Sequence, residues 1–273
     1  MAPEARPFAG DANRSLLTEV VDPPQVRLVN PDGRSTFLLI GDHAGNIVPQ
    51  RLGTLGLDET QRARHIAWDI GVAALGAALS AALDAVFIRQ TYSRLVVDCN
   101  RSPDAVDAIA EVSDGTTIPG NVALDEAARA ARFAEIHEPY HAAIADELAR
   151  RDSAGDPTIL VALHSFTPVF GGAPPRPWQI GILHDRGDAS FARACLAVLR
   201  GRRDLTVGDN EPYRMDAIDY TVPRHCYSAQ RPYVELEVRQ DLLAAEGGVA
   251  TWSAILADML TAAARSIEGM QTT

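Results

Sequence analysis

Short apolar runs alternate along this chain with segments in which apolar residues recur every three or four positions. The runs are rich in β-branched and aromatic residues and predict strands, whereas the three-to-four spacing predicts amphipathic helices. Strands are expected at 35–41, 85–90, 94–98, 158–163, 178–183 and 233–238, and helices at about 58–83, 124–151, 189–201 and 249–267. This alternation predicts a three-layer α/β/α fold with a mixed, mostly parallel sheet.

The N-terminal part of the chain lacks this periodicity. Residues 1–30 are rich in Pro and Asp, and they predict an irregular arm. No internal repeat, low-complexity tract or linker interrupts residues 31–273, which are therefore expected to form a single α/β domain.

Polar side chains follow the predicted strands where each strand ends. In open α/β sheets ligands bind beyond the carboxyl ends of the strands, so a site should carry polar groups there. The groups at these positions are Asp42-His43, Tyr92-Ser93-Arg94, Asp98 to Arg101, His164-Ser165, His184-Asp185, and Glu235 with Glu237. They terminate apolar runs, which distinguishes them from a solvated face.

Two histidines from separate strand ends, His43 and His164, suggest a metal site. With one carboxylate they would make three ligands and leave zinc a position for water. Asp69 is the favoured carboxylate, because an unpartnered acid near the start of an apolar helix is costly to bury. Two alternatives stay open: His65, four residues earlier, and Asn46, although Asn is a poor zinc ligand.

A second histidine pair, His137 and His141, has the four-residue spacing that places two imidazoles on one helix face. The letters His137-Glu138-Pro139-Tyr140-His141 fit HExxH, but Pro139 directly after Glu138 indicates a kink or a helix start there, which disfavours a regular zinc-binding helix. We expect a helix turn facing the site, with His141 touching substrate, rather than a metal pair.

Glu235 and Glu237 share one face of a predicted strand, so at least one of them is expected to face the site. The alternative is a solvent-facing edge strand, with Arg239 as the ion-pair partner of the two acids.

Composition limits the class of partner. The 273 residues carry a formal charge of −11, and the pI is about 5.0, which disfavours nucleic acid and anionic membranes. The three cysteines form no CxxC pair, and no leader peptide or membrane-spanning run is evident. A cytoplasmic protein acting on a small molecule is expected.

Six segments together resemble one known family. They are "DHAGN", "WDIGVAALGAAL", "YSRLVVDCNRSPDA", "LHSFTPVF", "DNEPY" and "VELEVRQDL". In this order, across roughly residues 35–245, they are similar to the N-formylglutamate amidohydrolase (deformylase) family, which is related to the zinc carboxypeptidases and aspartoacylases. The most specific element is the SR-x-V-V-D-x-NR block.

The resemblance implies a zinc-dependent exopeptidase-like fold and a role for each matched residue. One Zn²⁺ would be held by His43, Asp69 and His164, with Glu237 as the base and Arg94 beside the oxyanion. Glu235 stays open as the alternative base. The substrate-binding residues would be Asn100, Arg101, His141 and His225.

The implied activity is hydrolysis of the N-formyl or N-acyl amide of a small carboxylate-bearing substrate, such as N-formyl-L-glutamate in amino-acid metabolism. Known deformylases begin the first motif with Pro-His and carry Asp-Trp-His in the helix, whereas this chain has Trp68-Asp69-Ile70. The acyl substrate therefore stays open. The alternatives are a zinc carboxypeptidase-like exopeptidase and a non-catalytic carboxylate-binding protein.

Overall fold

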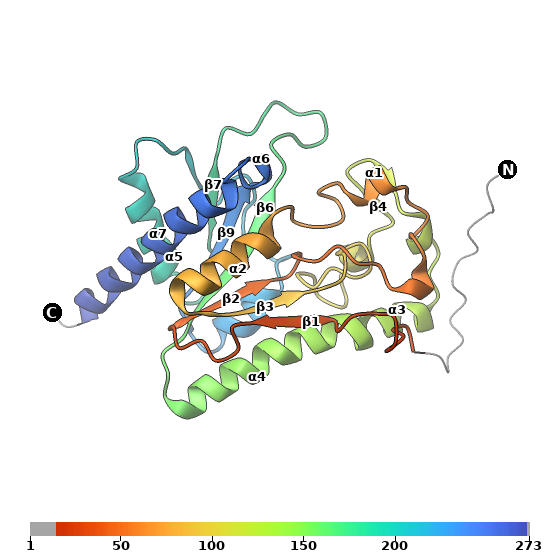
Figure 1. Cartoon of the computed structure of the whole chain (residues 1–273), viewed down its shortest axis with the longest axis horizontal. Coiled ribbons are helices and arrows are strands. Elements are labelled where there is room, and N and C mark those ends of the chain that lie inside the picture. The colour runs from red at the N-terminus through yellow and green to blue at the C-terminus, as the bar shows by residue number, and fades with distance from the viewer. Residues whose placement is uncertain (1–14, 272–273) are drawn as a thin grey trace.

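A seven-stranded sheet forms the centre of the molecule in the computed structural model, which describes residues 15–271 (Figure 1). The strand order is β1-β3-β2-β6-β9-β7-β8. The strands are β1 (Val26–Val29), β2 (Phe37–Gly41), β3 (Val86–Gln90), β6 (Ile159–Phe166), β7 (Ile180–Leu183), β8 (Val207–Asp209) and β9 (Tyr233–Arg239). β1 runs antiparallel to β3, and β7 runs antiparallel to β9, while the other neighbours are parallel. The predicted mixed, mostly parallel sheet is confirmed.

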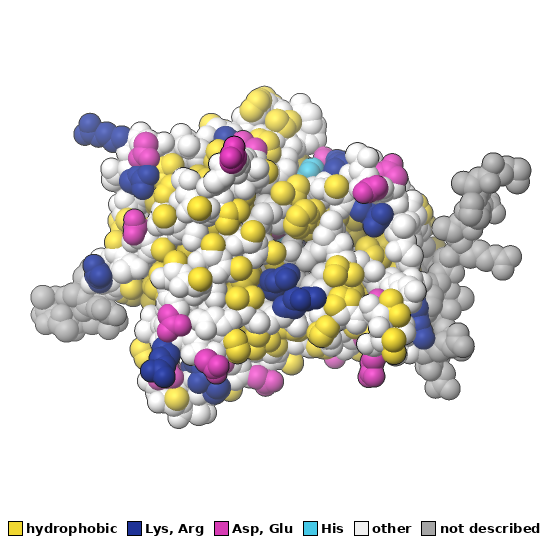
Figure 2. Space-filling model, viewed as in Figure 1, with side chains coloured by type: hydrophobic (Ala, Val, Ile, Leu, Met, Phe, Trp, Pro, Cys, Tyr) yellow, Lys and Arg dark blue, Asp and Glu magenta, His cyan; other side chains and the backbone are white. Residues whose placement is uncertain are grey.

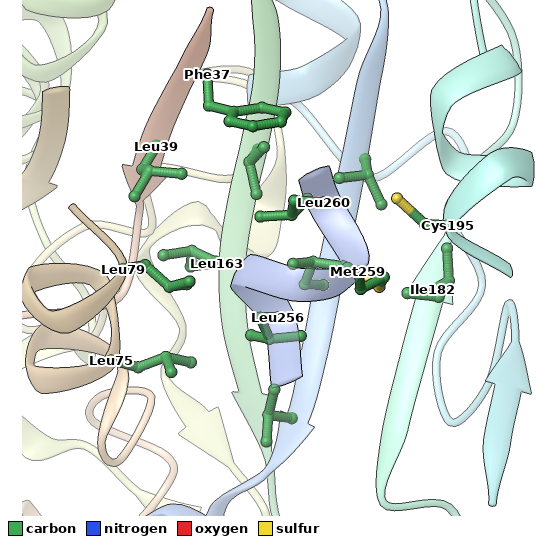
Figure 3. Close-up of a cluster of buried hydrophobic side chains, with 14 of the residues drawn as sticks. Phe37, Leu39, Leu75, Leu79, Leu163, Ile182, Cys195, Leu256, Met259 and Leu260 are labelled. Carbon is green, nitrogen blue, oxygen red and sulfur yellow. The ribbon is translucent and has the colours of Figure 1, made fainter. Parts of the chain in front are cut away.

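One face of the sheet is covered by three helices over an apolar core. The helices are α2 (Val72–Leu83), α5 (Ser190–Arg200) and α7 (Gly248–Gln271), and α2 and α7 lie side by side in Figure 1. Figure 3 shows Leu79 of α2, Cys195 of α5 and Met259 of α7 converging on this sheet face. The core side chains drawn there are hydrophobic, so this face chiefly supplies stability.

The opposite face is covered by α4 (Glu138–Ala154), which follows α3 (Glu126–Arg132) through a π-helical turn at Phe133–His137. Alternate residues of β2 point to the two faces: Leu38 packs with the α4 side chains, and Leu39 packs with the α2 side chains. The domain therefore has the three layers that the sequence predicts.

The remaining elements lie in the connections. They are the helices α1 (Glu59–Arg62) and α6 (Gln240–Ala244), the hairpin β4 (Val112–Ser113) and β5 (Thr116–Thr117), the 3₁₀ turns Gln50–Leu52, Val106–Ile109 and Pro119–Asn121, and the π-helical turn Pro223–Tyr227. Leu55, Tyr92 and Val96 contribute to a third apolar cluster beneath the long connections.

Three local predictions were wrong. Residues 94–98 form turns, because their apolar side chains enter the third cluster while Val96 N donates to Ser93 O, so no ladder forms. The predicted helix 58–83 is two helices, α1 and α2, with a loop between them. Residues 26–29, inside the predicted irregular arm 1–30, pair with β3 as an edge strand, and residues 1–14 of that arm lie outside the described part of the chain.

On the face of the molecule drawn in Figure 2, acidic and basic side chains are scattered among hydrophobic and neutral ones, and no broad basic patch is visible on the described residues. Among residues 15–271, no helix has the length and apolar character needed to cross a membrane.

Candidate metal centre and active site

The order of the strands brings the predicted site residues together. β2, β6 and β9 are parallel neighbours at the centre of the sheet, so their carboxyl ends share one edge. His43 follows β2 by two residues, and His164 lies near the end of β6. Glu237 of β9 stands opposite His164 in the ladder. The parallel register therefore places two imidazoles and a carboxyl group at one edge.

Asp69 reaches the same edge from the loop before α2. Its backbone N–H donates to His43 O at 2.9 Å, and Ser165 N donates to its Oδ2 at 3.2 Å. Gly71, with φ at +90°, lets the loop turn into the helix, and a Cβ there would lie 2.7 Å from the side chain of Leu243. The loop geometry thus fixes Asp69 between the two histidines.

His43, Asp69 and His164 form a buried group whose potential ligand atoms all lie within 4.8 Å of one another. Asp69 Oδ2 is 3.0 Å from His164 Nδ1 and 3.5 Å from His43 Nδ1. The Nδ1 atom of His43 is buried and makes no hydrogen bond to the described residues. A buried lone pair facing a carboxylate oxygen fits a cation ligand, so this group could bind a metal ion.

Each imidazole also has a carboxylate behind it. Nε2 of His43 donates to Asp98 Oδ1 at 2.7 Å, and Nε2 of His164 lies 3.5 Å from Asp42 Oδ2. A carboxylate behind a histidine fixes its tautomer and raises its basicity as a ligand. This arrangement is typical of a metal centre.

The charges of the group reinforce one another. Burial opposes ionisation of Asp69, but the neighbouring His43 and His164 hold its pKa far below the ordinary value. Burial also opposes protonation of His164, but Asp42 and Asp69 raise the pKa of this histidine well above its usual range. The group is thus built around ionised carboxylates, as a cation requires.

A cavity of about 590 Å³ opens beside this group. Both Glu235 and Glu237 line it, and burial raises the pKa of Glu237 to about 8 and that of Glu235 well above the ordinary value. Glu237 Oε2 is buried without a hydrogen-bond partner among residues 15–271. The alternative of a solvent-facing edge strand was wrong, because β9 lies between β6 and β7.

Arg94, Asn100 and Arg101 line the same cavity. Arg94 binds Asp98 Oδ2 through Nε at 3.0 Å and Nη2 at 2.6 Å, and its Nη1 lies 3.6 Å from Asp69 Oδ1. Arg101 donates through Nε to the exposed Asp107 at 3.0 Å and through Nη1 to Asn100 O at 3.0 Å. Two arginines therefore line the cavity beside His43, Asp69 and His164, which are together called the metal group below.

His141 and His225 do not join these residues. Neither belongs to the cavity lining; both are buried behind it, where His141 Nδ1 and His225 Nε2 are 3.1 Å apart. His141 Nε2 lies 2.9 Å from Cys99 O, and the adjacent Asn100 and Arg101 line the cavity, so His141 contacts the cavity wall from behind and the predicted contact of His141 and His225 with substrate stays a prediction.

The two alternative ligands also have other contacts. His65 lines the cavity, but its Nε2 lies 3.3 Å from Asp114 Oδ2. The side-chain amide of Asn46 donates to Arg62 O at 2.8 Å. Asp69 is therefore the carboxylate that the fold brings to His43 and His164.

Asp42 and Asp98 support the imidazoles, although no role for either residue was predicted from the sequence. Asp98 lies inside the SR-x-V-V-D-x-NR block and Asp42 directly precedes His43, so their positions were the available signal. Phe170 and Tyr213 also line the cavity. They end the "LHSFTPVF" and "DNEPY" segments, so their membership of these segments was the available signal.

Comparison with known proteins gives one family. The model of the N-formylglutamate amidohydrolase family matches residues 35–244. A gene product of Agrobacterium tumefaciens with a solved structure is 38% identical, and the match covers 93% of this chain and 99% of that one with a TM-score of 0.89. The N-formylglutamate amidohydrolase of Ralstonia eutropha is 19% identical over 92% of this chain and 99% of that one, with a TM-score of 0.62. No curated protein matches the sequence.

Proposed function

The chain belongs to the N-formylglutamate amidohydrolase family and is an amidohydrolase; on that premise we propose that it is a zinc-dependent enzyme cleaving an N-formyl or N-acyl amide. The substrate would be a small amino-acid derivative that carries a free carboxylate, such as N-formyl-L-glutamate. The observation that carries the proposal is the meeting, in one cavity, of the His43-Asp69-His164 group, a buried glutamate and an arginine.

The donor set suits zinc. Two imidazoles and one carboxylate leave a tetrahedral ion one position for an exchangeable ligand, which distinguishes catalytic from structural zinc sites. A zinc ion held by His43, Asp69 and His164 would supply Lewis-acid chemistry, namely activation of water and polarisation of the amide carbonyl.

Glu237 is the proposed proton carrier. It stands opposite His164 in the sheet and is buried in the cavity. Its carboxylate takes a proton from the attacking water and passes it to the departing amine nitrogen, and one group serves both steps because they are sequential. A cation in the neighbouring group favours the ionised form of Glu237 that acts as the base.

The arginines would bind negative charge on the substrate. Arg101 presents a planar guanidinium suited to a two-point grip on a carboxylate, and Asn100 adds an amide nearby. Asp107, the present partner of Arg101, is 54% exposed in its side chain, so this ion pair is weak enough to exchange for a substrate. Arg94, whose Nη1 lies 3.6 Å from Asp69 Oδ1, would stabilise the developing oxyanion.

A second candidate is favoured by the size of the cavity. About 590 Å³ is within the range of pockets that hold drug-sized ligands. The cavity therefore has room for a dipeptide-like substrate, which a zinc carboxypeptidase-like exopeptidase would cleave with the same residues.

The test compares substrates with and without metal. The protein, purified without chelator, is analysed for zinc and assayed on N-formyl amino acids, other N-acyl amino acids and blocked dipeptides, then again after chelation and zinc addition. We expect about one zinc per chain, with hydrolysis of formylated substrates that chelation abolishes and zinc restores. Faster turnover of blocked dipeptides would favour the exopeptidase, and absence of both metal and turnover would favour a carboxylate-binding protein.

Glu237→Gln tests the proton carrier. It should retain zinc but lose about 10²–10⁴-fold in kcat, because only the proton transfer is removed. Glu235→Gln is the matched control on the same strand face. If Glu237→Gln keeps full activity and Glu235→Gln loses it, the base is Glu235.

A further inference from the structure

Three histidines that the proposed chemistry does not use lie together behind the cavity. His137 and His141 are on one face of the α3–α4 segment, and His225 comes from the π-helical turn Pro223–Tyr227. The ring centroids of His137 and His141 are 4.5 Å apart, and those of His141 and His225 are 5.3 Å apart. These three residues are called the histidine clamp below.

The clamp binds the backbone of the turn that carries Asn100 and Arg101. His137 Nε2 lies 3.0 Å from Arg101 O, and His141 Nε2 lies 2.9 Å from Cys99 O. Because a carbonyl oxygen can only accept, both Nε2 atoms carry protons and donate. In a neutral His141 ring the Nδ1 atom then accepts, so His225 Nε2 donates to it at 3.1 Å. For neutral rings the contacts thus fix which nitrogen of each ring carries the proton.

The local backbone is shaped to present these rings. Pro139 has no N–H to bond the carbonyl of residue 135, and a π-helical turn, Phe133–His137, directly precedes α4 at this point. A second such turn begins at Pro223 and carries His225. π-helical turns are rare and are frequent at functional sites, and here both supply rings to the clamp.

The 219–221 segment holds the same turn from another side. Asn100 Oδ1 accepts from the backbone N–H groups of Tyr220 and Thr221, each at 2.9 Å. The Thr221 hydroxyl donates to Cys99 O at 3.2 Å, alongside His141. The Tyr220 ring packs 5.1 Å from that of His141. The Cys99–Arg101 backbone is therefore held by donors from two separate parts of the chain.

We propose that the histidine clamp positions the residues that would bind the substrate carboxylate. His137 and His141 hold the backbone of Cys99–Arg101, so that Asn100 and Arg101 are already in place at the cavity before substrate binds. This rests on the proposed role of Arg101. A binding site whose backbone is fixed in advance binds its ligand more tightly, because less conformational entropy is lost on binding. Burial lowers the pKa of His141 to about 3 and that of His225 to about 4, so both rings keep the neutral form near pH 7.

The test separates the donor of His137 from its bulk, in the full zinc-loaded chain. His137→Leu fills the space without a donor, and His137→Gln restores an amide N–H near the position of Nε2. Leu148→Ala, a buried change on α4 outside the clamp, controls for simple destabilisation. Each variant is assayed on an N-formyl amino acid and on its carboxamide analogue, which lacks the carboxylate that Arg101 would grip.

For His137→Leu we expect KM for the carboxylate substrate to rise about three- to tenfold, the effect of one lost hydrogen bond. The kcat and zinc content should stay within about twofold, kcat/KM for the carboxamide should not change, and His137→Gln should recover the wild-type KM. Equal losses on both substrates, or the same KM rise in Leu148→Ala, would overturn the proposal.

Hydrogen–deuterium exchange adds a readout that needs no substrate. Backbone amides of residues 98–102 should exchange faster in His137→Leu than in the wild type, the Gln variant or Leu148→Ala. Unchanged exchange in His137→Leu would overturn the clamp. Arg101→Lys tests the proposed function separately from the clamp. If this variant keeps the preference for the carboxylate substrate over the carboxamide, the proposed binding of the carboxylate by Arg101 is wrong. The exchange data still decide whether the clamp holds the turn.

Discussion

The metal-group histidines, His43 and His164, and the clamp histidines are all buried near the same end of the sheet, yet their neighbours differ. Carboxylates stand around the first pair, whereas carbonyl oxygens and other imidazoles stand around the second. The pKa of His164 is raised well above its usual range, and the pKa of His141 is lowered to about 3. Burial lowers both values, so the neighbouring charges decide the difference. A buried histidine is thus suited to bind a cation or to donate a hydrogen bond as a neutral ring, according to what surrounds it.

The largest expected difference between the two groups is in metal binding. His43→Ala removes a ligand and should abolish zinc binding and hydrolysis, because two protein ligands do not make a stable site. His137→Ala should retain about one zinc per chain. Metal analysis of both variants, purified side by side, checks the contrast. Zinc retained in His43→Ala, or lost in His137→Ala, would contradict the assignment of the two groups.

A smaller effect is expected from the carboxylates behind the ligands. Asp98→Asn should weaken zinc binding about 10–100-fold, because the amide orients His43 less firmly and adds no negative charge. Asp114→Asn is a matched control: Asp114 lines the same cavity but pairs with Arg64 and His65. Competition with a chelator measures both affinities. If zinc binding weakens equally in the two variants, the effect comes from the loss of any negative charge in the cavity and not from the support of His43 by Asp98.

The clamp histidines should also make the free energy of unfolding depend on pH. The titratable side chains that act on His141 are His137, His225 and Asp42. Since the folded pKa of His141 lies below its unfolded value of about 6.5, the unfolded chain binds the proton that the folded chain excludes. The stability from this group is therefore fully present above pH 6.5 and is lost as the pH falls toward about 3.

The measurement is the free energy of unfolding in urea between pH 7 and pH 4.5, for the wild type and for His141→Leu. Subtracting the two curves removes contributions of the metal group that both proteins share. The wild type should lose up to about 1.4 kcal/mol per pH unit more than the variant below pH 6.5. Parallel curves would mean that His141 is already protonated in the folded state.

The contrast between the two groups also explains what the sequence could reveal. His43 and His164 were found because apolar runs end at them, and parallel strands carry such ends to one edge. Asp69 was found as a poorly placed acid in an apolar segment, although the predicted helix around it is in fact a loop. The burial of these residues and their positions at strand ends were thus readable from the sequence pattern, whereas the strand order comes only from the structure.

The clamp could not be predicted in the same way. The four-residue spacing of His137 and His141 correctly places them on one face, but spacing does not say whether that face meets carboxylates or carbonyls. The partner carbonyls belong to a turn that was predicted to follow a strand at 94–98, and His225 lies 84 residues away from His141 in the chain. Every residue has a backbone carbonyl, so the sequence does not show which carbonyls accept these hydrogen bonds, and only the folded structure reveals them.

The smallest effect is expected at His65, which shares the cavity with the metal group but belongs to neither histidine group. Its Nε2 contacts Asp114 Oδ2 at 3.3 Å, and burial lowers its pKa although Asp114 opposes this. His65→Gln should therefore change zinc affinity and kcat by no more than about twofold, the scale of one partly exposed polar contact. Zinc titration and steady-state kinetics, run beside His43→Ala, measure both. A loss of zinc in His65→Gln would show that the loop before α2 rearranges around the ion and that proximity to carboxylates in the present fold is not sufficient to identify its ligands.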